Sequence, residues 1–318
     1  MLFIFQLIGE KMERVINTVL KNIAKEKNYE YETFSHDWIV RIKNKGKVLT
    51  TYGYIMQGID SVSQKICRDK SALYEILNKN NIPAIPHELF LGKKKQKIYL
   101  GKELGLEDFY SAFEKYGDLV IKDNNGGSGI DVYKVSKKEQ IEPVVTKLLN
   151  KDKDVAISPY FNVEDEYRII VYKSKPEIIF RKQRPNIVGN GIDTIHNLIK
   201  EKFGKIIEVD EWIDLDYVPK KDERVVLRWM HNLRNGASVE KIHDDEKREK
   251  LFSLASKVAS IVGINFASID IMDVDGEFKV LEVNAGVTLE KFARASSENY
   301  KKVEDLYRKI VFEVLEWN

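Results

Sequence analysis

Hydrophobic residues recur about every three to four positions in three stretches of the chain, and this spacing predicts amphipathic helices. The three stretches are residues 12–25, 71–80 and 251–262. Asp69 stands where the second helix needs an N-cap, and Pro83 prevents its continuation. Gly263 ends the third helix. The sequence contains no internal repeat.

Short apolar or alternating runs between these helices predict strands. The expected strands are residues 2–7, 38–42, 47–49, 119–122, 132–135, 155–157, 167–172, 177–180, 267–272 and 277–283. Asn44-Lys45-Gly46 and Val274-Asp275-Gly276 each separate two adjacent runs and predict hairpins. Because strands and helices are mixed irregularly, the sequence predicts an α+β fold of packed lobes, with a small α/β unit over residues 1–66.

Composition and charge limit the class of protein. The chain has 318 residues, of which 43% are hydrophobic, enough for two domains or three small lobes with a buried core. Its 52 basic and 50 acidic residues leave a net charge of +2, which removes the main argument for a nucleic-acid partner. The single cysteine, Cys67, excludes a disulfide framework and a cysteine-based zinc site. Residues 2–8 are apolar but far shorter than the ~20 residues that span a bilayer, so we expect a cytoplasmic protein without a membrane partner.

A glycine-rich segment follows the strand expected at residues 119–122. Gly126-Gly127-Ser128-Gly129 allows the backbone to approach an anion closely, and its amides can point at phosphate. The segment matches neither of the two common nucleotide-binding fingerprints, so a simple turn between two strands is the alternative interpretation. Lys122, at the end of the apolar strand, can either reach solvent or neutralise a phosphate.

Acidic residues flank the C-terminal hairpin. A three-residue loop at 274–276 predicts that Asp270 faces Val280. The residues on that face are then Ser268, Asp270, Met272, Phe278, Val280, Glu282 and Asn284. Asp270 and Glu282 become diagonal neighbours about 7–8 Å apart at the backbone, and with Asn284 they offer the hard oxygen ligands that Mg²⁺ prefers. A two-residue loop would place Asp270 and Glu282 on opposite faces, and acidic residues on a solvated sheet face are the alternative.

Cationic side chains gather in two further segments. Arg181 and Arg184 end an expected strand, and Arg228 and Asn232 lie in the segment of residues 224–236. Arginine binds a carboxylate or phosphate through two parallel hydrogen bonds and keeps its charge at all relevant pH values. These residues are candidates for binding an anionic substrate, and surface ion pairs are the alternative for each.

Taken in chain order, these segments resemble the ATP-grasp ligases. In the second half of the chain they resemble the branch that contains cyanophycin synthetase and the ribosomal-protein glutamate ligases. The matching segments are residues 69–70, 81–86, 120–129, 157–161, 165–168, 189–195 and 227–236, with Asp270, Glu282 and Asn284. The resemblance implies the ATP-grasp fold, in which two α+β lobes sandwich ATP after a short N-terminal α/β domain. The implied domains are residues 1–66, a lid lobe over 67–156, and a C-terminal lobe with the metal site over 157–318.

The resemblance also implies a role for each matching residue. Lys70 and Lys122 would contact the ATP phosphates beneath a lid formed by Gly127, Ser128 and Gly129. Pro159, Tyr160 and Phe161 would form the hinge against adenine, next to Ser158, where many relatives have Glu, and Glu166 would hold the ribose hydroxyls. Asp270, Glu282 and Asn284 would hold two Mg²⁺ ions, with Mn²⁺ as an alternative metal. Arg228 and either Arg181 or Arg184 would hold an acylphosphate, with Asn232 beside them as a further catalytic residue.

The activity implied by the resemblance is ATP-dependent ligation of a carboxylic acid to an amine. A carboxylate attacks the γ-phosphate to give an acylphosphate and ADP, and an amine then displaces phosphate to form a peptide-like amide. Small-molecule substrates, amino acids or peptides, are expected, and homo-oligomerisation is left open. A small-molecule kinase on the same scaffold and a nucleotide-binding module without catalysis are the alternative functions. The identities of acid and amine are not carried over, because the chain departs from its relatives directly after Asn284, at Ser268 and in its short N-terminal lobe.

Overall fold

The computed structural model describes residues 13–101 and 105–316, so the strand expected at residues 2–7 lies outside the described residues. The chain divides into two compact units. Unit 1 comprises Met1–Gly58, Phe180–Ile242 and Gly286–Asn318, and unit 2 comprises Ile59–Ile179 and His243–Ala285. The expected division into residues 1–66, 67–156 and 157–318 stays a prediction.

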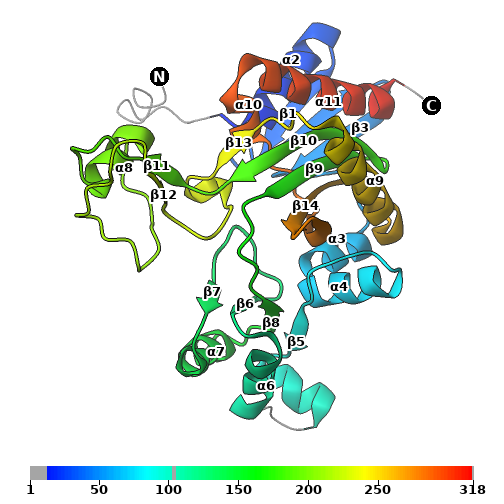
Figure 1. Ribbon diagram of the computed structural model, residues 1–318. Helices are drawn as coiled ribbons and strands as arrows, with labels where there is room; N and C mark the ends of the chain where they lie inside the picture. The colour runs from blue at the N-terminus through cyan, green and yellow to red at the C-terminus, as the bar shows by residue number, and fades with distance from the viewer. Residues whose placement is uncertain (1–12, 102–104, 317–318) are drawn as a thin grey trace. The chain divides into compact units, whose positions relative to one another are not determined.

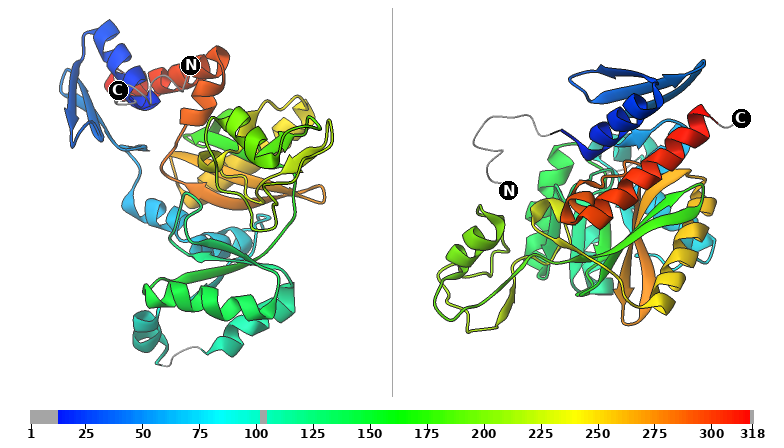
Figure 2. Two further views of the ribbon diagram at one scale, coloured as in Figure 1. Left: turned by 90° about the vertical axis from the view of Figure 1, so that its left-hand side faces the viewer. Right: turned by 90° about the horizontal axis from the view of Figure 1, so that it is seen from above.

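Unit 1 begins with a helix and a small sheet. Strands β1 (Glu30–Phe34), β2 (Ile39–Asn44), β3 (Lys47–Tyr52) and β4 (Ile55–Met56) form an antiparallel sheet in chain order. Helix α2 (Val15–Lys27) confirms the helix predicted at residues 12–25, and it packs on this sheet beside the C-terminal helix α11 (Ser297–Leu315), as Figure 2 shows. The predicted hairpin is also confirmed, because Asn44 pairs with Lys47 across a two-residue turn.

The middle segment of unit 1 forms a separate small core. Strand β11 (Asn186–Val188) pairs with β12 (Arg224–Val226), and helix α8 (Ile195–Phe203) packs on them. The buried residues of this core are Ile187, Ile195, Leu198, Ile199, Ile207 and Leu227. The short helix η3 (Leu233–Asn235) and strand β13 (Ser238–Glu240) follow, and α10 (Glu290–Ala295) contacts both β13 and α11.

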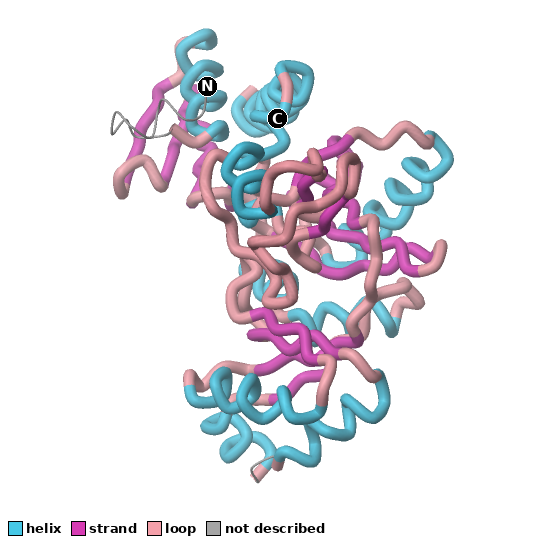
Figure 3. Tube along the Cα trace, turned by 60° about the vertical axis from the view of Figure 1, so that its left-hand side comes forward, coloured by secondary structure: helices cyan, strands magenta, loops and turns pink. Residues whose placement is uncertain are grey.

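Unit 2 contains a four-stranded sheet with helices on one face. The strand order is β5 (Glu88–Phe90), β8 (Val155–Pro159), β6 (Leu119–Asp123) and β7 (Val132–Val135), which confirms the strands predicted at 119–122, 132–135 and 155–157. Helices α6 (Leu106–Tyr116) and α7 (Ile141–Asn150) lie along one side of this sheet (Figures 1 and 3). Leu119 and Ile121 are buried against these helices. Since side chains alternate along a strand, Lys122 points to the opposite face.

Three short helical segments complete this part of unit 2. They are α5 (Lys93–Lys95), the π-helix η1 (Gln96–Leu100) and the 3₁₀-helix η2 (Lys138–Gln140).

Strands β9 (Glu166–Tyr172), β14 (Phe266–Val274) and β15 (Glu277–Asn284) belong to a five-stranded sheet with the order β13-β10-β9-β14-β15, in which β10 spans Lys175–Gln183. Strand β14 is antiparallel to both β9 and β15, and this part of the sheet is called the second sheet of unit 2. Helices α3 (Ser61–Arg68), α4 (Lys70–Lys79) and α9 (Asp245–Val262) pack against these strands. Helices α4 and α9 confirm the helices predicted at 71–80 and 251–262; Asp69 caps α4 by accepting a hydrogen bond from the amide of Ala72. Strand β10 begins in unit 2, and its last residues pair with β13 in unit 1.

The hairpin between β14 and β15 differs from the predicted one. Val274 pairs with Glu277, so the turn has two residues, Asp275 and Gly276, with φ of 53° and 86°. The predicted three-residue loop is therefore wrong, as is the predicted pairing of Asp270 with Val280. Asp270 instead pairs with Glu282, because a β-bulge leaves Leu281 without a partner in the ladder.

The bulge decides which side chains share a face with Asp270. Val280 and Phe278 pair with Ile271 and Asp273, on the face opposite to the predicted one. Lys279 pairs with Met272 and takes their place. Glu282 and Asn284 nevertheless lie on the predicted face, since the extra residue offsets the shorter turn.

No helix in the described ranges has both the length and the apolar composition needed to cross a bilayer.

Candidate active site

Strand pairing brings polar residues from three strands to one face of the second sheet of unit 2. Arg168 on β9 pairs with Asp270 on β14, which in turn pairs with Glu282 on β15. Glu166 lies on the same face, two residues before Arg168, and pairs with Met272. Asn284 lies on this face two residues after Glu282 and pairs with Ser268. Four residues that the sequence predicted for the ribose and metal sites, Glu166, Asp270, Glu282 and Asn284, are therefore on a common face.

Arg168 is a residue of this face that sequence reasoning missed. Its Nε and Nη2 donate to the two carboxylate oxygens of Asp270, both at 2.7 Å. Asp270 is 1% exposed and Arg168 16%, so this is a largely desolvated, bidentate ion pair. Burial acts to lower the pKa of Arg168. The negative charges of Asp270, Glu282 and Glu166 outweigh burial and raise this pKa above its usual value. Arg168 follows Glu166 by two residues, where a strand is predicted to begin. This spacing could have indicated that the two side chains share a face of the sheet.

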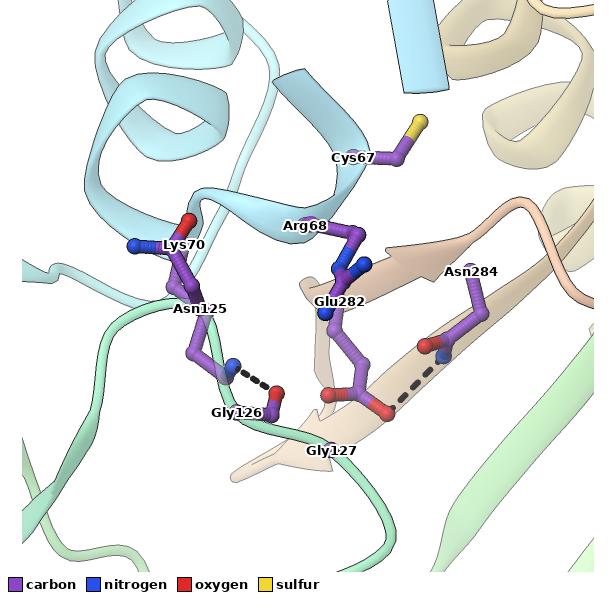
Figure 4. Close-up of a pocket in the computed structure, with 8 residues that line it drawn as sticks. All are labelled: Cys67, Arg68, Lys70, Asn125, Gly126, Gly127, Glu282 and Asn284. Atoms are coloured by element: carbon purple, nitrogen blue, oxygen red, sulfur yellow. Dashed lines mark hydrogen bonds between the residues drawn. The ribbon is translucent and has the colours of Figure 1, made fainter. Parts of the chain in front are cut away.

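Glu282 and Asn284 line a pocket of about 100 Å³ (Figure 4). The amide of Asn284 donates to Glu282 Oε1 at 2.9 Å, so each side chain orients the other. The remaining lining comes from the end of α3, the start of α4 and the glycine-rich loop: Cys67, Arg68, Lys70, Asn125, Gly126 and Gly127. Burial raises the pKa of the Cys67 thiol to about 12, so the thiol is neutral. The pocket thus places cations opposite one carboxylate and one amide.

Lys70 joins the glycine-rich loop to helix α4. Its ammonium donates to the backbone carbonyls of Gly126 at 2.6 Å, Asn124 at 3.2 Å and Asp123 at 3.4 Å. Burial lowers the pKa of Lys70, while the negative charge of Glu282 opposes that shift. Three carbonyls are as many acceptors as an ammonium has N–H groups, so the loop is tied to the lysine.

Lys122 is buried on the face of the four-stranded sheet opposite to helices α6 and α7. Burial, reinforced by the positive charge of Lys70, lowers the pKa of Lys122 to about 8, and Glu282 and Glu166 oppose this shift. The two lysines predicted to contact phosphate are thus within electrostatic reach of each other and of Glu282.

The start of the glycine-rich loop is anchored by Asn124. Its side-chain oxygen accepts hydrogen bonds from the amide and hydroxyl of Ser71 at 3.1 and 3.0 Å, and its Nδ2 donates to Asp69 at 2.8 Å. Ser128 and Gly129 have φ of 61° and 71°. The loop therefore leaves a fixed anchor and turns through left-handed backbone, as a loop that surrounds an anion does.

The predicted adenine hinge is Pro159, Tyr160 and Phe161. Pro159 is the last residue of β8, and the amide of Tyr160 donates to the carbonyl of Asp118 at 2.8 Å. Phe161 packs on a small apolar cluster that includes Ile85 and Val163. These contacts fix the course of the hinge, while its role with adenine stays a prediction.

His87 is a second residue that sequence reasoning did not assign to this region. It is 3% exposed, and its Nδ1 lies 2.9 Å from the carbonyl oxygen of Ile85. Burial, together with the positive charge of Lys122, holds the pKa of His87 well below its usual range. His87 is therefore a neutral imidazole within electrostatic reach of Lys122, and it adds no charge there.

The predicted catalytic residues lie in unit 1, where each has a local partner. Arg228 forms an ion pair with Glu208, and Arg181 forms one with Glu240 across β10 and β13. Asn232 accepts a hydrogen bond from the amide of Arg234 at 2.9 Å and thereby caps η3. The backbone carbonyl of Arg184 accepts a hydrogen bond from Asn186. Contact of Arg228, Asn232 and one of Arg181 and Arg184 with an acylphosphate stays a prediction.

The predicted metal ligands fit a magnesium nucleotide in part. In the described part of the chain, no group of three or more His, Cys, Asp or Glu side chains is arranged to hold a metal ion. Mg²⁺ usually keeps its waters and substrate phosphates and takes one or two protein carboxylates, and Glu282 with Asn284 satisfies this need beside the pocket. Asp270 would have to exchange its bond with Arg168 for a bond to the metal.

The fold is that of the ATP-grasp proteins. The structure aligns with that of a bifunctional glutathione synthetase from Pasteurella multocida, with a TM-score of 0.57 and 17% identity, over 93% of this chain and 44% of that chain. It also aligns with a D-alanine–D-alanine ligase from Bacillus anthracis, with a TM-score of 0.55 and 17% identity, over 80% of this chain and 69% of the other.

Sequence comparison finds similar proteins for part of the chain. Residues 227–304 match the family described as a RimK-like ATP-grasp domain. It is 24% identical over 252 residues to the glutathione biosynthesis bifunctional protein of Clostridium perfringens, and 27% identical over 195 residues to the cyanophycin synthetase of Trichormus variabilis. These matches cover 70% and 54% of this chain but only 31% and 21% of the two relatives.

Proposed function

We propose that the chain is an ATP-dependent ligase that joins a carboxylic acid to an amine and releases ADP and phosphate. The observation that carries this proposal is the pocket in which Lys70 and the glycine-rich loop lie opposite Glu282 and Asn284, with Lys122 within electrostatic reach. Positive charge and a closely approaching glycine-rich backbone, together with hard oxygen ligands, are what a metal–triphosphate complex requires. The names of the similar proteins, a glutathione biosynthesis protein, cyanophycin synthetase and D-alanine–D-alanine ligase, support an amino acid or peptide as substrate.

The proposed reaction has two steps. An oxygen of the substrate carboxylate attacks the γ-phosphorus of ATP, and the bond to the β-phosphate oxygen breaks to give an acylphosphate and ADP. The amine then attacks the acyl carbon, loses a proton, and expels phosphate to leave an amide. Most of the acceleration in phosphoryl transfer comes from positioning and charge stabilisation.

The residues of this chain have separate parts in these steps. Lys70 and Lys122 neutralise charge on the phosphates, and residues 126–129 exclude water that would hydrolyse the acylphosphate. Glu166 holds the ribose, and residues 159–161 hold adenine. When bound through Glu282 and Asn284, and through Asp270 once it parts from Arg168, Mg²⁺ supplies further charge neutralisation of the phosphates. Arg228, Asn232 and one of Arg181 and Arg184 hold the acylphosphate. The cytoplasmic location and a homo-oligomeric state stay predictions.

A substrate screen tests this function. The purified chain is incubated with Mg·ATP and mixtures of amino acids and short peptides, and phosphate release, the nucleotide product and the product mass are measured. We expect ADP, phosphate and a condensed product that form only when acid and amine are both present. Trapping with hydroxylamine should give a hydroxamate. AMP as product would contradict the proposal, and a phosphorylated product that resists hydroxylamine would indicate a kinase instead.

The metal-binding role of Glu282 is tested by Glu282→Gln, which keeps the shape of the side chain but removes its charge. We expect ADP formation to fall about 100-fold or more, because a charged group at the reacting phosphates is lost. Glu277→Gln on the same strand is the matched control, because Glu277 is exposed at the turn. Equal activity of the two variants, both folded by circular dichroism, would remove Glu282 from the site.

A further inference from the structure

Arg68 lines the pocket but has no part in the functions proposed above. It is the last residue of α3, its side chain is exposed, and it extends from the end of the helix towards the strand that carries Glu282 (Figure 4). Burial is the largest cause of the lowered pKa of Lys70, and the positive charge of Arg68 acts in the same direction. Among residues 13–101 and 105–316, no carboxylate forms an ion pair with Arg68, although Glu282 lines the same pocket.

The two cations of the pocket differ in what they can offer a ligand. The ammonium of Lys70 donates to the carbonyls of Asp123, Asn124 and Gly126, and therefore contributes charge to the pocket but has its N–H groups engaged. Arg68 has a planar guanidinium with five N–H groups and lies at the exposed side of the same pocket. An oxyanion in the pocket would thus find its hydrogen-bond donors on Arg68.

The remaining lining favours a phosphoryl group as that oxyanion. Glu282 and Asn284, the two residues that fit a metal bound to the phosphates, line the same pocket as Arg68, together with Gly126 and Gly127. The pocket volume of about 100 Å³ suits a group of phosphate size. The thiol of Cys67 is neutral and adds no negative charge.

We propose that Arg68 binds the terminal phosphoryl group of ATP, the group that is transferred to the substrate carboxylate. This inference rests on the proposed function and adds a residue to it. Arg68 donates two parallel hydrogen bonds to the γ-phosphate oxygens, which only a guanidinium fork does. It therefore distinguishes the triphosphate from the diphosphate, whereas Lys70 and Lys122 contribute positive charge near the phosphates that both nucleotides share.

Direct binding tests this assignment without turnover. Isothermal titration compares Mg·ADP with Mg·AMPPNP, a triphosphate analogue that is not hydrolysed, for the wild-type chain and for Arg68→Gln, Arg68→Lys and Lys65→Gln. Lys65 is the matched control, because it is an exposed cation in the same last turn of α3 that does not line the pocket. We expect Arg68→Gln to weaken AMPPNP binding about 10-fold or more and to change ADP binding less than about twofold. Arg68→Lys should restore only part of the loss, and Lys65→Gln should bind both nucleotides like the wild type.

The contrary outcomes separate the two proposals. If the wild type binds AMPPNP and Arg68→Gln binds it equally well, Arg68 does not contact the terminal phosphoryl group. Equal losses for ADP and AMPPNP would likewise overturn the assignment, because Arg68 would then act on phosphates common to both. If affinity for nucleotides is unchanged but the KM for the carboxylic acid rises, Arg68 binds the substrate carboxylate instead. Failure of the wild type to bind either magnesium nucleotide would overturn the proposed function itself.

Discussion

Lys122 is buried, and its proposed role at the ATP phosphates requires a positive charge there. Burial and the charge of Lys70 lower the pKa of Lys122 to about 8, so near neutral pH the side chain is mostly protonated and slightly above it the charge is lost. A bound phosphate favours the protonated form, so nucleotide binding and proton uptake are linked. The pH range in which this residue assists nucleotide binding should therefore end close to physiological pH.

The affinity for Mg·ADP should consequently fall as the pH rises above about 8. In this range the free protein has lost the Lys122 proton, and binding must restore it, which costs up to about a factor of 10 for each pH unit. Titration calorimetry at pH 7.0 and 9.0, in buffers of different ionisation enthalpy, measures both the affinity and the proton uptake. Lys122→Arg keeps its charge at both pH values and should show a flatter profile. An equal decline in Lys122→Arg would show that another group titrates.

At the residue scale, the sequence indicated which residues form the candidate site better than it indicated the hydrogen bonds between them. Asp270, Glu282 and Asn284 could be proposed from residue type and spacing, because alternation along strands places such residues on one face. The bond between Arg168 and Asp270 could not, since it depends on which strand lies next to β14. The hydrogen bonds from Lys70 to three loop carbonyls could not be predicted either, because they depend on the path of the loop.

At the element scale, the hairpin of β14 and β15 shows how two local features combine. The sequence contains a turn signal at Asp275-Gly276, but the turn is one residue shorter than predicted, and the bulge at Leu281 restores the shared face of Asp270 and Glu282. Periodic segments such as α2, α4, α9, β6 and β7 were predictable because their patterns are local. A bulge is set by how two strands pair, which no single segment encodes.

The two-residue turn requires backbone at positive φ, and Gly276→Ala tests this requirement. Gly276 has a φ of 86°, and an added Cβ would meet no atom within 4 Å, so the cost is one of backbone conformation alone. We expect the free energy of unfolding to fall by about 1 kcal/mol, as measured by urea denaturation. Asp275→Gly is the matched control and should be neutral or stabilising, since Asp275 also has positive φ. A stable Gly276→Ala variant would mean that the turn adopts another form.

At the scale of the whole molecule, the residues proposed for nucleotide binding and those proposed for the acylphosphate lie in different units. Lys70, Lys122, Glu166 and Glu282 belong to unit 2, whereas Arg181 and Arg228 belong to unit 1. The sequence indicated the ATP-grasp fold through the order of its motifs. It did not indicate that each unit is built from separate stretches of chain, because contacts between distant segments leave no local pattern.

Hydrogen exchange can test this separation. With Mg·ADP, we expect slower exchange in peptides that cover the glycine-rich loop, residues 124–129, and strand β15, because these carry the proposed phosphate and metal contacts. Peptides from α8 and from β1 to β4 in unit 1 should exchange at unchanged rates. The Glu282→Gln variant should show weaker protection at the same nucleotide concentration. Equal protection throughout the chain, or none in the loop, would contradict the proposed location of the nucleotide.

The chain passes from one unit to the other after Gly58, Ile179, Ile242 and Ala285. Neither unit can therefore be produced as one continuous fragment, and a single genetic crossover cannot exchange one of them for its counterpart in a relative. Residues 180–242 form one continuous stretch of unit 1 between two of these junctions, the first of which lies within β10, and they include Arg181, Arg184, Arg228 and Asn232. An exchange of this stretch with its counterpart in a relative, with β10 kept whole, would leave the pocket-lining residues in their native sequence.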